Sequence, residues 1–282
     1  MAQTLGAKTD HLRPGLIDLA HTLTAVPATK VASDIGPLWL PAYDSVMTPW
    51  IAHHGTWEPD ESAFLRSHLK PGMTFLDVGA NVGYFSILGA RIVGPSGAVV
   101  AIEPEPTNYA LLCANLWEAR AVNVEPIRAA ASSFDGPLSL SVSRENCGDH
   151  RSFLKRPLDQ VLEVVGVRVD EVFAPDARVD VIKIDIQGAD HRAVLGMERL
   201  VARCEPVLLV EFWPRGIEEL GDRPVDVLSC YRGLGLNVSL LAAPGIDTGL
   251  AMDQQLVETV ATSASGFTTI ILTPSARKAR TP

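Results

Sequence analysis

Positive charge is scarce in this sequence. Its 282 residues include 24 Lys and Arg but 33 Asp and Glu, which gives a formal net charge of −9 at pH 7. A broad basic surface of the kind that binds phosphate groups is therefore not expected, and a nucleic-acid partner is disfavoured. The same balance is compatible with a cationic small molecule as the ligand.

Cysteines and long apolar runs are also few. The four cysteines are far apart and form no C-x-x-C pair, so they indicate neither a disulfide framework nor a zinc site, and no metal centre is predicted. Cys113, Cys204 and Cys230 lie in apolar or helical surroundings and are interpreted as small buried side chains, whereas Cys147 lies in a polar loop. No run reaches the roughly 18 apolar residues of a membrane span, and the N-terminus has no apolar signal core. We expect a reduced, cytoplasmic protein without a membrane partner.

Hydrophobic residues, by contrast, make up 47% of the chain, which is enough for one large α/β domain with a buried core. Residues 1–70 are interpreted as an N-terminal cap and lid region that forms a compact unit with a domain over residues 71–282. Proline and aromatic residues are dense over residues 26–57, which predicts an irregular cap rather than a repeat of the sheet. Helices are expected on either side of it, over residues 11–23 and 58–69.

From residue 74 onward, apolar runs alternate with helical patterns. This order predicts parallel strands joined by right-handed crossovers, hence a Rossmann-like, doubly wound, mostly parallel sheet of about six to eight strands. Two further short strands, over 138–142 and 164–169, indicate a hairpin-like excursion near the ligand. The core strands are expected over 74–78, 99–104, 123–130, 179–185, 206–212, 236–241 and 267–272, and the helices over 82–93, 107–119, 188–200 and 225–234.

The segment TFLDVGANVGYFS, residues 74–86, indicates a strand that turns through two glycines into a helix. Gly79 and Gly83 allow a tight turn and a close approach of the backbone to a ligand. Glu103, at the end of the next strand, lies 20 positions after Gly83, where a carboxylate that binds a ribose is expected. Asn81 replaces the glycine that admits a pyrophosphate in dinucleotide-binding loops, so the loop favours a phosphate-free nucleoside such as S-adenosylmethionine.

Three segments occur in order along the chain: DVGANVGYFS, AIEPEPTNYALLCANL and VIKIDIQGADHRAVLGM. With them the chain resembles the FkbM family of methyltransferases over residues 72–214. The resemblance implies a class I fold with seven strands, S-adenosyl-L-methionine as methyl donor and S-adenosyl-L-homocysteine as product. It also implies O-methylation of a polyketide or sugar hydroxyl, the chemistry for which the family is named. The family usually carries glutamates where this chain has Gln187 and Asp190, and this departure puts a metal requirement in doubt.

The residues expected to contact the cofactor lie at the ends of the first three strands, where open α/β sheets bind ligands. Glu103 is assigned to the ribose hydroxyls, with a charge at the start of the following helix as its alternative role. Asp77 is expected to bind the amino group or to brace the glycine turn. The loop residues Gly79, Ala80, Asn81 and Gly83 are assigned to the methionine end, and Pro104, Arg128 and Ala129 to the adenine.

Methyl transfer from a sulfonium mainly requires in-line positioning of the nucleophile and a group that takes its proton. Asp185 is the first candidate for that base, with a structural hydrogen-bonding role as its alternative. His53 and His54 in the cap are the second, and His150 in the excursion is the third, each with surface or packing roles as the alternative. The acceptor pocket is expected to include Trp57, Glu58, Asn146, His150, Gln187, Asp190, Glu211 and Trp213.

Asp185 and three of these pocket residues, Glu58, Asp190 and Glu211, are acidic, which favours a polycationic acceptor. The sequence therefore predicts an S-adenosylmethionine-dependent methyltransferase of secondary metabolism and antibiotic biosynthesis that acts on a small natural product. N-methylation of an aminosugar, as in aminoglycosides, is preferred, and O-methylation of a polyketide or sugar hydroxyl is the alternative. A nicotinamide-dependent oxidoreductase and a binding protein without activity are the other interpretations. A homodimer is left open.

Overall fold

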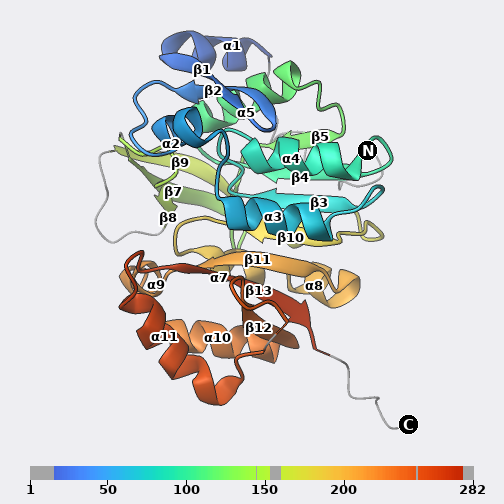
Figure 1. Cartoon of the computed structure of the whole chain (residues 1–282), viewed down its shortest axis with the longest axis vertical. Helices are drawn as coiled ribbons and strands as arrows, with labels where there is room; N and C mark the ends of the chain where they lie inside the picture. The colour runs from blue at the N-terminus through green and yellow to red at the C-terminus, as the bar shows by residue number, and fades with distance from the viewer. Residues whose placement is uncertain (1–15, 144, 153–159, 246, 276–282) are drawn as a thin grey trace.

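The structure is a computed structural model that describes residues 16–143, 145–152, 160–245 and 247–275. The main strands are β3 (Thr74–Val78), β4 (Ala98–Ile102), β5 (Val124–Ile127), β10 (Val181–Ile184), β11 (Val207–Phe212), β12 (Leu236–Leu240) and β13 (Thr268–Pro274). They form one sheet in the order β12-β13-β11-β10-β3-β4-β5 (Figure 1). β13 is antiparallel to both of its neighbours, and the other pairs are parallel. The predicted doubly wound, mostly parallel sheet of seven strands is confirmed.

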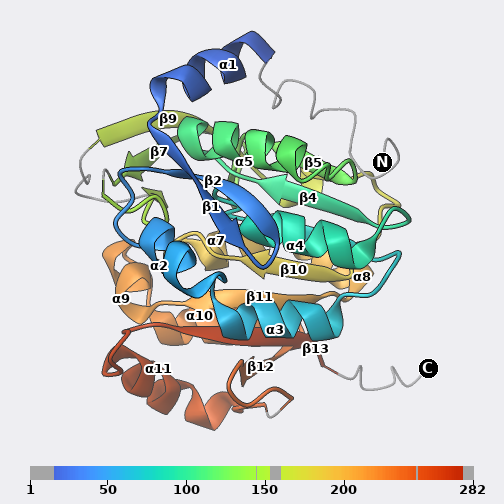
Figure 2. The ribbon, with the colours of Figure 1, turned by 45° about the horizontal axis from the view of Figure 1, so that its top comes forward.

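Strand residues alternate between two hydrophobic clusters, one on each face of the sheet. In β3, Phe75 belongs to one cluster and Leu76 to the other. Because both faces are covered, the central strands are apolar along their length. The first face carries α3 (Pro59–His68), α4 (Tyr84–Val93) and α5 (Pro106–Glu118), and the second carries α7 (Asp190–Leu195), α8 (Glu198–Cys204), α9 (Pro214–Glu219), α10 (Pro224–Gly233) and α11 (Asp253–Ala261) (Figure 2).

The strand order reverses between β3 and β10. The chain proceeds from β3 to β4 and β5 on one side and later enters β10 and β11 on the other. Ligands of open α/β sheets bind beyond the carboxyl ends of the strands at such a point. The register pairs Ile184 with both Val78 and Val210, and Val78 also with Ile102. The residues that follow them, Gly79, Glu103, Asp185 and Glu211, therefore emerge together at one edge of the sheet.

The N-terminal cap is more regular than expected. It contains α1 (Leu16–Ala25), a hairpin of β1 (Ala28–Ser33) and β2 (Gly36–Pro41), and α2 (Met47–His54). The prediction of irregular structure over residues 26–57 is wrong, because prolines are tolerated in a two-stranded sheet, which consists of edges. Leu38 and Leu40 are buried and fix the hairpin to the core. Of the helix predicted over residues 11–23, α1 covers the part from Leu16, and residues 11–15 lie outside the described residues.

The predicted excursion forms a separate small sheet. It consists of β6 (Ala130–Ala131), β7 (Gly136–Val142), β8 (Arg151–Ser152) and β9 (Gln160–Val167), in the order β6-β9-β7-β8, and is followed by α6 (Val169–Val172). β7 and β9 pair in antiparallel fashion, as a hairpin requires. The helix predicted over residues 188–200 is instead divided into α7 and α8. The short helices α9, α11 and η2 (Leu250–Met252) were not predicted. No helix in the described parts of the chain has both the length and the apolarity needed to cross a membrane.

Candidate functional site

The loop between β3 and α4 is held against both neighbouring strands. The N–H groups of Gly79 and Ala80 donate to the carbonyl oxygen of Ile102 at 2.9 and 3.0 Å. Gly79 has a φ of +81°, and a Cβ added there would lie 2.0 Å from the carbonyl oxygen of Asp185. Only glycine therefore allows the backbone to pass this closely between β4 and β10.

Glu103 is buried just beyond β4, beside this loop. Its carboxylate accepts the N–H of Asn81 at 2.8 Å and the N–H of Glu105 at 2.9 Å. Burial raises the pKa of Glu103 to about 8, although the two backbone donors act in the opposite direction. Glu105, rather than Glu103, caps α5 by accepting the N–H of Asn108 at 2.6 Å. The alternative role foreseen for Glu103, a charge at the helix start, thus belongs to its neighbour.

The segment from Glu145 to His150 forms a roof over the glycine loop. The carbonyl oxygen of Cys147 accepts the side-chain amides of Asn81 at 3.1 Å and of Asn108 at 2.8 Å. The N–H of Cys147 donates to Asp44 in the cap at 3.0 Å. Cys147 is buried despite its polar neighbours in the sequence, because these three bonds hold it between the two elements. The roof is therefore fastened both to the loop and to the cap.

The loop, Glu103 and the roof surround a cavity of about 300 Å³, here called the main cavity. Six of the predicted cofactor residues line it, namely Gly79, Ala80, Asn81, Glu103, Pro104 and Ala129. The other three predicted cofactor residues, Asp77, Gly83 and Arg128, do not line it. Asp77 is buried within β3, where it accepts the Ser86 hydroxyl at 2.6 Å, and burial raises its pKa to about 6. Gly83 packs against Leu112, and Arg128 is exposed. The expectation of direct ligand contact at these three positions is corrected, and Asp77 has a bracing role.

One side of the main cavity carries a buried lysine among carboxylates. Lys183 is 5% exposed, and its Nζ lies 2.9 Å from Asp185, 3.6 Å from Glu58 and 4.4 Å from the centre of the Phe85 ring. Burial lowers the pKa of Lys183, but Asp185 and Glu58 outweigh this effect, so its pKa lies above the usual value. Sequence reasoning missed Lys183, whose signal is a charged residue inside the otherwise apolar strand VIKI.

Seven of the predicted catalytic and acceptor residues line the main cavity, namely Trp57, Glu58, Asn146, His150, Asp185, Gln187 and Glu211. His53 and His54 do not, because they lie exposed at the end of α2, where the His54 ring stacks on Trp50. Their prediction as candidate bases is wrong. Asp190 is also absent from the lining: it accepts the N–H groups of Ile186 and Gly188 at 3.1 and 3.0 Å and braces the turn after β10.

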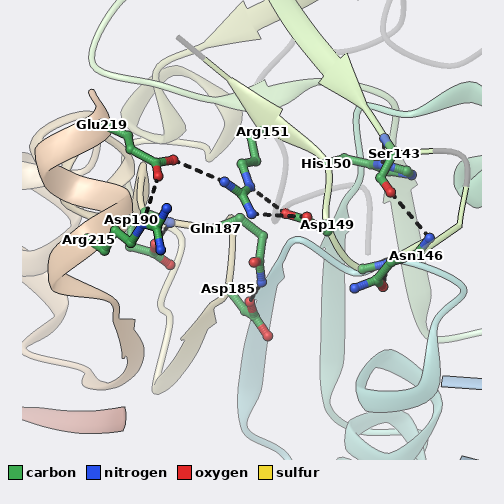
Figure 3. A network of polar contacts seen from close by, with 12 residues as sticks. Ser143, Asn146, Asp149, His150, Arg151, Asp185, Gln187, Asp190, Arg215 and Glu219 are labelled. Carbon is green, nitrogen blue, oxygen red and sulfur yellow. Dashed lines mark hydrogen bonds and ion pairs between the residues drawn. The ribbon is translucent and has the colours of Figure 1, made fainter. Parts of the chain in front are cut away.

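Trp213, predicted in the acceptor pocket, lies instead against Arg151, which is at the centre of a polar network. Figure 3 shows the polar contacts of Arg151. The Arg151 guanidinium donates to both carboxylate oxygens of Asp149 and, at 3.1 Å, to Glu219 in α9. It also lies 4.4 Å from the centre of the Trp213 ring. Trp213 is absent from the lining of the main cavity, and the prediction is corrected. The network ties the roof to α9.

A second cavity, of about 310 Å³ and here called the side cavity, adjoins the first. Both cavities are lined by Glu58, Lys183, Asp185 and Glu211, a group that we call the acidic junction. Glu61 also lines the side cavity and accepts the hydroxyl of Thr269 at 2.5 Å. The aromatic rings of the side cavity are Trp50, Trp57 and Phe267.

Residues 77–231, more than half of the chain, match the sequence profile of the methyltransferase FkbM domain. The chain belongs to the FkbM methyltransferase family. Within the matched residues lie the glycine loop, Glu103 and the acidic junction residues Lys183, Asp185 and Glu211, whereas Glu58 in the cap precedes them.

This FkbM methyltransferase is similar to other proteins over parts of its length. It is 42% identical over 84 residues to the protein-L-isoaspartate O-methyltransferase of Triticum aestivum, covering 30% of this chain and 33% of that protein. It is 33% identical over 121 residues to protein-L-isoaspartate O-methyltransferase 1 of Arabidopsis thaliana, covering 42% of this chain and 45% of that protein. The chain thus spans less than half the length of these relatives. The solved FkbM methyltransferase of Methylobacillus flagellatus KT superposes with a TM-score of 0.46 at 14% identity, over 75% of this chain and 50% of that chain.

FkbM methyltransferases depend on S-adenosylmethionine, which supplies an activated methyl group to a nucleophile. The main cavity offers groups that fit this molecule. The Oδ1 atoms of Asn81 and Asn108 are buried and have no hydrogen-bond partner among the described residues. Each carboxylate oxygen of Glu103 accepts one backbone N–H and keeps capacity for a ribose hydroxyl. Glu103, Asn81 and Asn108 would therefore hold the nucleoside, and the tight glycine loop would lie against the methionine end.

The buried carboxyl groups of this FkbM methyltransferase predict an unusual dependence of stability on pH. Burial raises the pKa of Asp77 to about 6 and of Asp190 to about 7, each from 3.8, and that of Glu103 to about 8 from 4.5. These groups bind protons more tightly in the folded chain than in the unfolded chain. Their contribution to stability is therefore complete at low pH and is lost as pH rises toward 8. We expect the free energy of unfolding to fall by up to about 1.4 kcal/mol per pH unit for each such carboxyl.

Urea unfolding of the ligand-free protein at several pH values between about 5 and 8 measures this slope. Asp77→Asn is the matched variant, since it removes one of these titrating groups and is expected to flatten the slope below about pH 6. A free energy of unfolding that rises across the whole range would contradict the prediction.

Proposed function

We propose that this FkbM methyltransferase binds S-adenosylmethionine in the main cavity and transfers its methyl group to an amine of a small natural product that occupies the side cavity. An aminosugar of the aminoglycoside type is the preferred acceptor. The observation that carries this proposal is the composition of the side cavity: among the described residues, its lining contains the carboxyl groups of Glu58, Glu61, Asp185 and Glu211 but only one cationic side chain, Lys183.

This arrangement supports a cationic ligand on electrostatic grounds. Lys183 is engaged by Asp185 at 2.9 Å and by Glu58 at 3.6 Å, so a single ammonium group faces the four carboxyl groups among the described residues of the side cavity. An ammonium group placed among them would form charge-assisted hydrogen bonds in a partly desolvated space. The three aromatic rings would cover the apolar face of a sugar ring or attract its ammonium groups.

Paired acceptors test the proposal. Glucosamine, kanamycin and gentamicin are incubated with enzyme and S-adenosylmethionine beside glucose, which lacks the amine. Mass spectrometry detects the gain of one methyl, and fragmentation locates it. We expect N-methylation of at least one aminosugar, with an amine preference of roughly 10- to 100-fold, as one or two charge-assisted hydrogen bonds would give.

The outcomes separate the alternatives. Methyl transfer to hydroxyl oxygens alone would replace the proposal by O-methylation, the chemistry for which the family is named. Amines that all stay unmodified would overturn the amine assignment. Calorimetry with S-adenosylhomocysteine tests separately whether the main cavity binds S-adenosylmethionine. Binding of NAD without binding of S-adenosylhomocysteine would overturn that part of the proposal.

A further inference from the structure

The acidic junction contains more carboxyl groups than are needed to bind a cation, and the chemistry of an amine acceptor gives one of them a further task. Most aliphatic amines are ammonium ions at neutral pH, and an ammonium nitrogen has no lone pair with which to attack a methyl group. A proton must therefore leave the nitrogen after binding, at the place where the two cavities meet. Glu58, Asp185 and Glu211 are the carboxylates at this place.

Two of the three carboxylates are poorly suited to take the proton. Asp185 accepts the Lys183 ammonium at 2.9 Å and the Gln187 amide at 3.2 Å, so both of its oxygens are engaged. Glu211 has a buried Oε2 without a hydrogen-bond partner among the described residues. Burial, followed by Asp185, raises the pKa of Glu211 well above its usual value, which disfavours the ionised form that a base needs.

His150 is also unsuited to this task. It lines the main cavity but is absent from the lining of the side cavity, and its Nδ1 lies 3.3 Å from the N–H of Ser143. Burial lowers the pKa of His150, which weakens it as a proton acceptor.

Glu58 differs from these groups in its backbone conformation. It has φ 41° and ψ 75°, a left-handed conformation that is rare outside glycine, asparagine and aspartate. The turn is held by Ser62, whose N–H donates to the Glu58 carbonyl at 2.9 Å and whose hydroxyl donates to the Trp57 carbonyl at 2.8 Å. Backbone strain of this kind persists where the surrounding structure imposes it, and it is concentrated at functional sites.

The Glu58 side chain does not cap α3, although Glu58 occupies the N-cap position. Glu58 is the N-cap residue of α3, yet its carboxylate makes no cap hydrogen bond to the helix. It lines both cavities instead, and its nearest cation, the Lys183 ammonium, is 3.6 Å away, longer than the contact with Asp185. The side chain is 29% exposed, so a proton bound there has a route to solvent.

We propose that Glu58 is the catalytic base that takes the proton from the ammonium group of the acceptor, an inference that rests on the proposed function. An N–H bond of the ammonium breaks, its electron pair stays on nitrogen, and the proton bonds to a carboxylate oxygen of Glu58. The nitrogen lone pair then forms the bond to the methyl carbon while the carbon–sulfur bond breaks and its electron pair stays on sulfur. Glu58 releases the proton to solvent and is restored.

The charges around Glu58 determine how this step depends on pH. Burial, Asp185 and Glu61 raise the pKa of Glu58, and Lys183 opposes them; Glu211 faces the same junction from β11. Because the pKa of Glu58 is raised to about 8, most of Glu58 is protonated near neutral pH, and the reaction should accelerate as pH rises and ionises it. A cationic acceptor favours the ionised form, so its binding should release a proton from Glu58 to the buffer.

The test compares Glu58→Gln with Asp60→Asn, a matched control that removes a carboxylate from an exposed position in the same turn of α3. The acceptor is the aminosugar of the panel that wild-type enzyme methylates fastest. At about pH 7, Glu58→Gln should lower kcat by ~10²- to 10⁴-fold, and Asp60→Asn should not. The deficit should shrink as pH approaches the pKa of the acceptor amine, because solvent then removes the proton. It should also shrink for an O-alkylhydroxylamine analogue, which is neutral at that pH.

Two binding measurements accompany the kinetics. Titration of S-adenosylhomocysteine into Glu58→Gln should give wild-type affinity, which shows that the variant is folded. Titration of the aminosugar into the complex with S-adenosylhomocysteine, in two buffers of different ionisation heat, should show proton release for wild type and less for Glu58→Gln.

A deficit in kcat that is equal at every pH and for both acceptors would overturn the role of Glu58 as base and leave amine methylation standing. Absence of amine methylation by wild type would overturn the proposed function itself. If Glu58→Gln does not fold, Glu58→Asp, which keeps the carboxylate, replaces it and should keep the rise of rate with pH.

Discussion

Replacing Gly79 by alanine is expected to weaken S-adenosylhomocysteine binding by ~100-fold, which corresponds to about 2.8 kcal/mol of binding free energy. The new Cβ would lie 2.0 Å from the Asp185 carbonyl oxygen, which is a backbone atom and cannot rotate away. A φ of +81° adds strain of its own, because alanine disfavours that region. The loop and the end of β10 must then separate, and the main cavity loses its shape.

Calorimetric titration measures the affinity, and urea unfolding shows whether the variant remains folded. Gly233→Ala in α10 is the control, since no atom lies within 4 Å of the added Cβ and its φ is not positive. This control should bind normally and be equally or slightly more stable. Wild-type affinity in Gly79→Ala would mean that the loop tolerates a side chain and that the cavity is formed in another way.

Replacing Lys183 by methionine is expected to lower the free energy of unfolding by about 3–5 kcal/mol at pH 8, the usual effect of removing one partner from a buried ion pair. Methionine fills a similar volume but leaves Asp185 and Glu58 without their cation. The deficit should decrease toward about pH 5, because carboxyl groups that have lost the lysine gain protons more readily as pH falls.

Urea unfolding at both pH values tests this expectation. The control is Arg66→Met, which breaks an exposed ion pair with Asp34 at 2.8 Å and should change stability by about 0–1 kcal/mol. A Lys183→Met deficit no larger than that of the control, or one that grows as pH falls, would show that the carboxylates do not depend on Lys183.

The sheet and the residues of the glycine loop that line the main cavity could be predicted because their signals are local in the sequence. The run 74–86 contains a strand, a glycine turn and a helix start, and Glu103 follows at a spacing that one crossover helix determines. The positions of Gly79, Asn81 and Glu103 at the main cavity follow from strand register alone. Asp77 could not be placed in the same way, because its side chain turns to Ser86 within the core.

The acceptor half depends on contacts between distant segments, which local patterns do not show. Glu58, Lys183 and Glu211 come from three parts of the chain and meet only because β10 lies beside β11 with α3 above them. His53 and His54 had the right chemistry, but the direction of α2 carries them to the surface. The role of Lys183 does not follow from the sequence, because the strand around it is apolar and its second partner, Glu58, is remote in the sequence, although Asp185 is only two residues away.

The hydrogen bonds of Cys147 couple the shape of the main cavity to the position of α2, so the two cannot change independently during evolution. The carbonyl oxygen of Cys147 accepts the side-chain amides of Asn81 and Asn108 at the main cavity, while its N–H donates to Asp44, which also accepts the N–H of Thr48 at the start of α2. The same helix carries Trp50, part of the wall of the side cavity. Substitutions that reshape this helix for a new acceptor would therefore alter cofactor retention as well. Descendants of this enzyme that change acceptors should compensate at residues 44 and 147, or change the opposite wall instead.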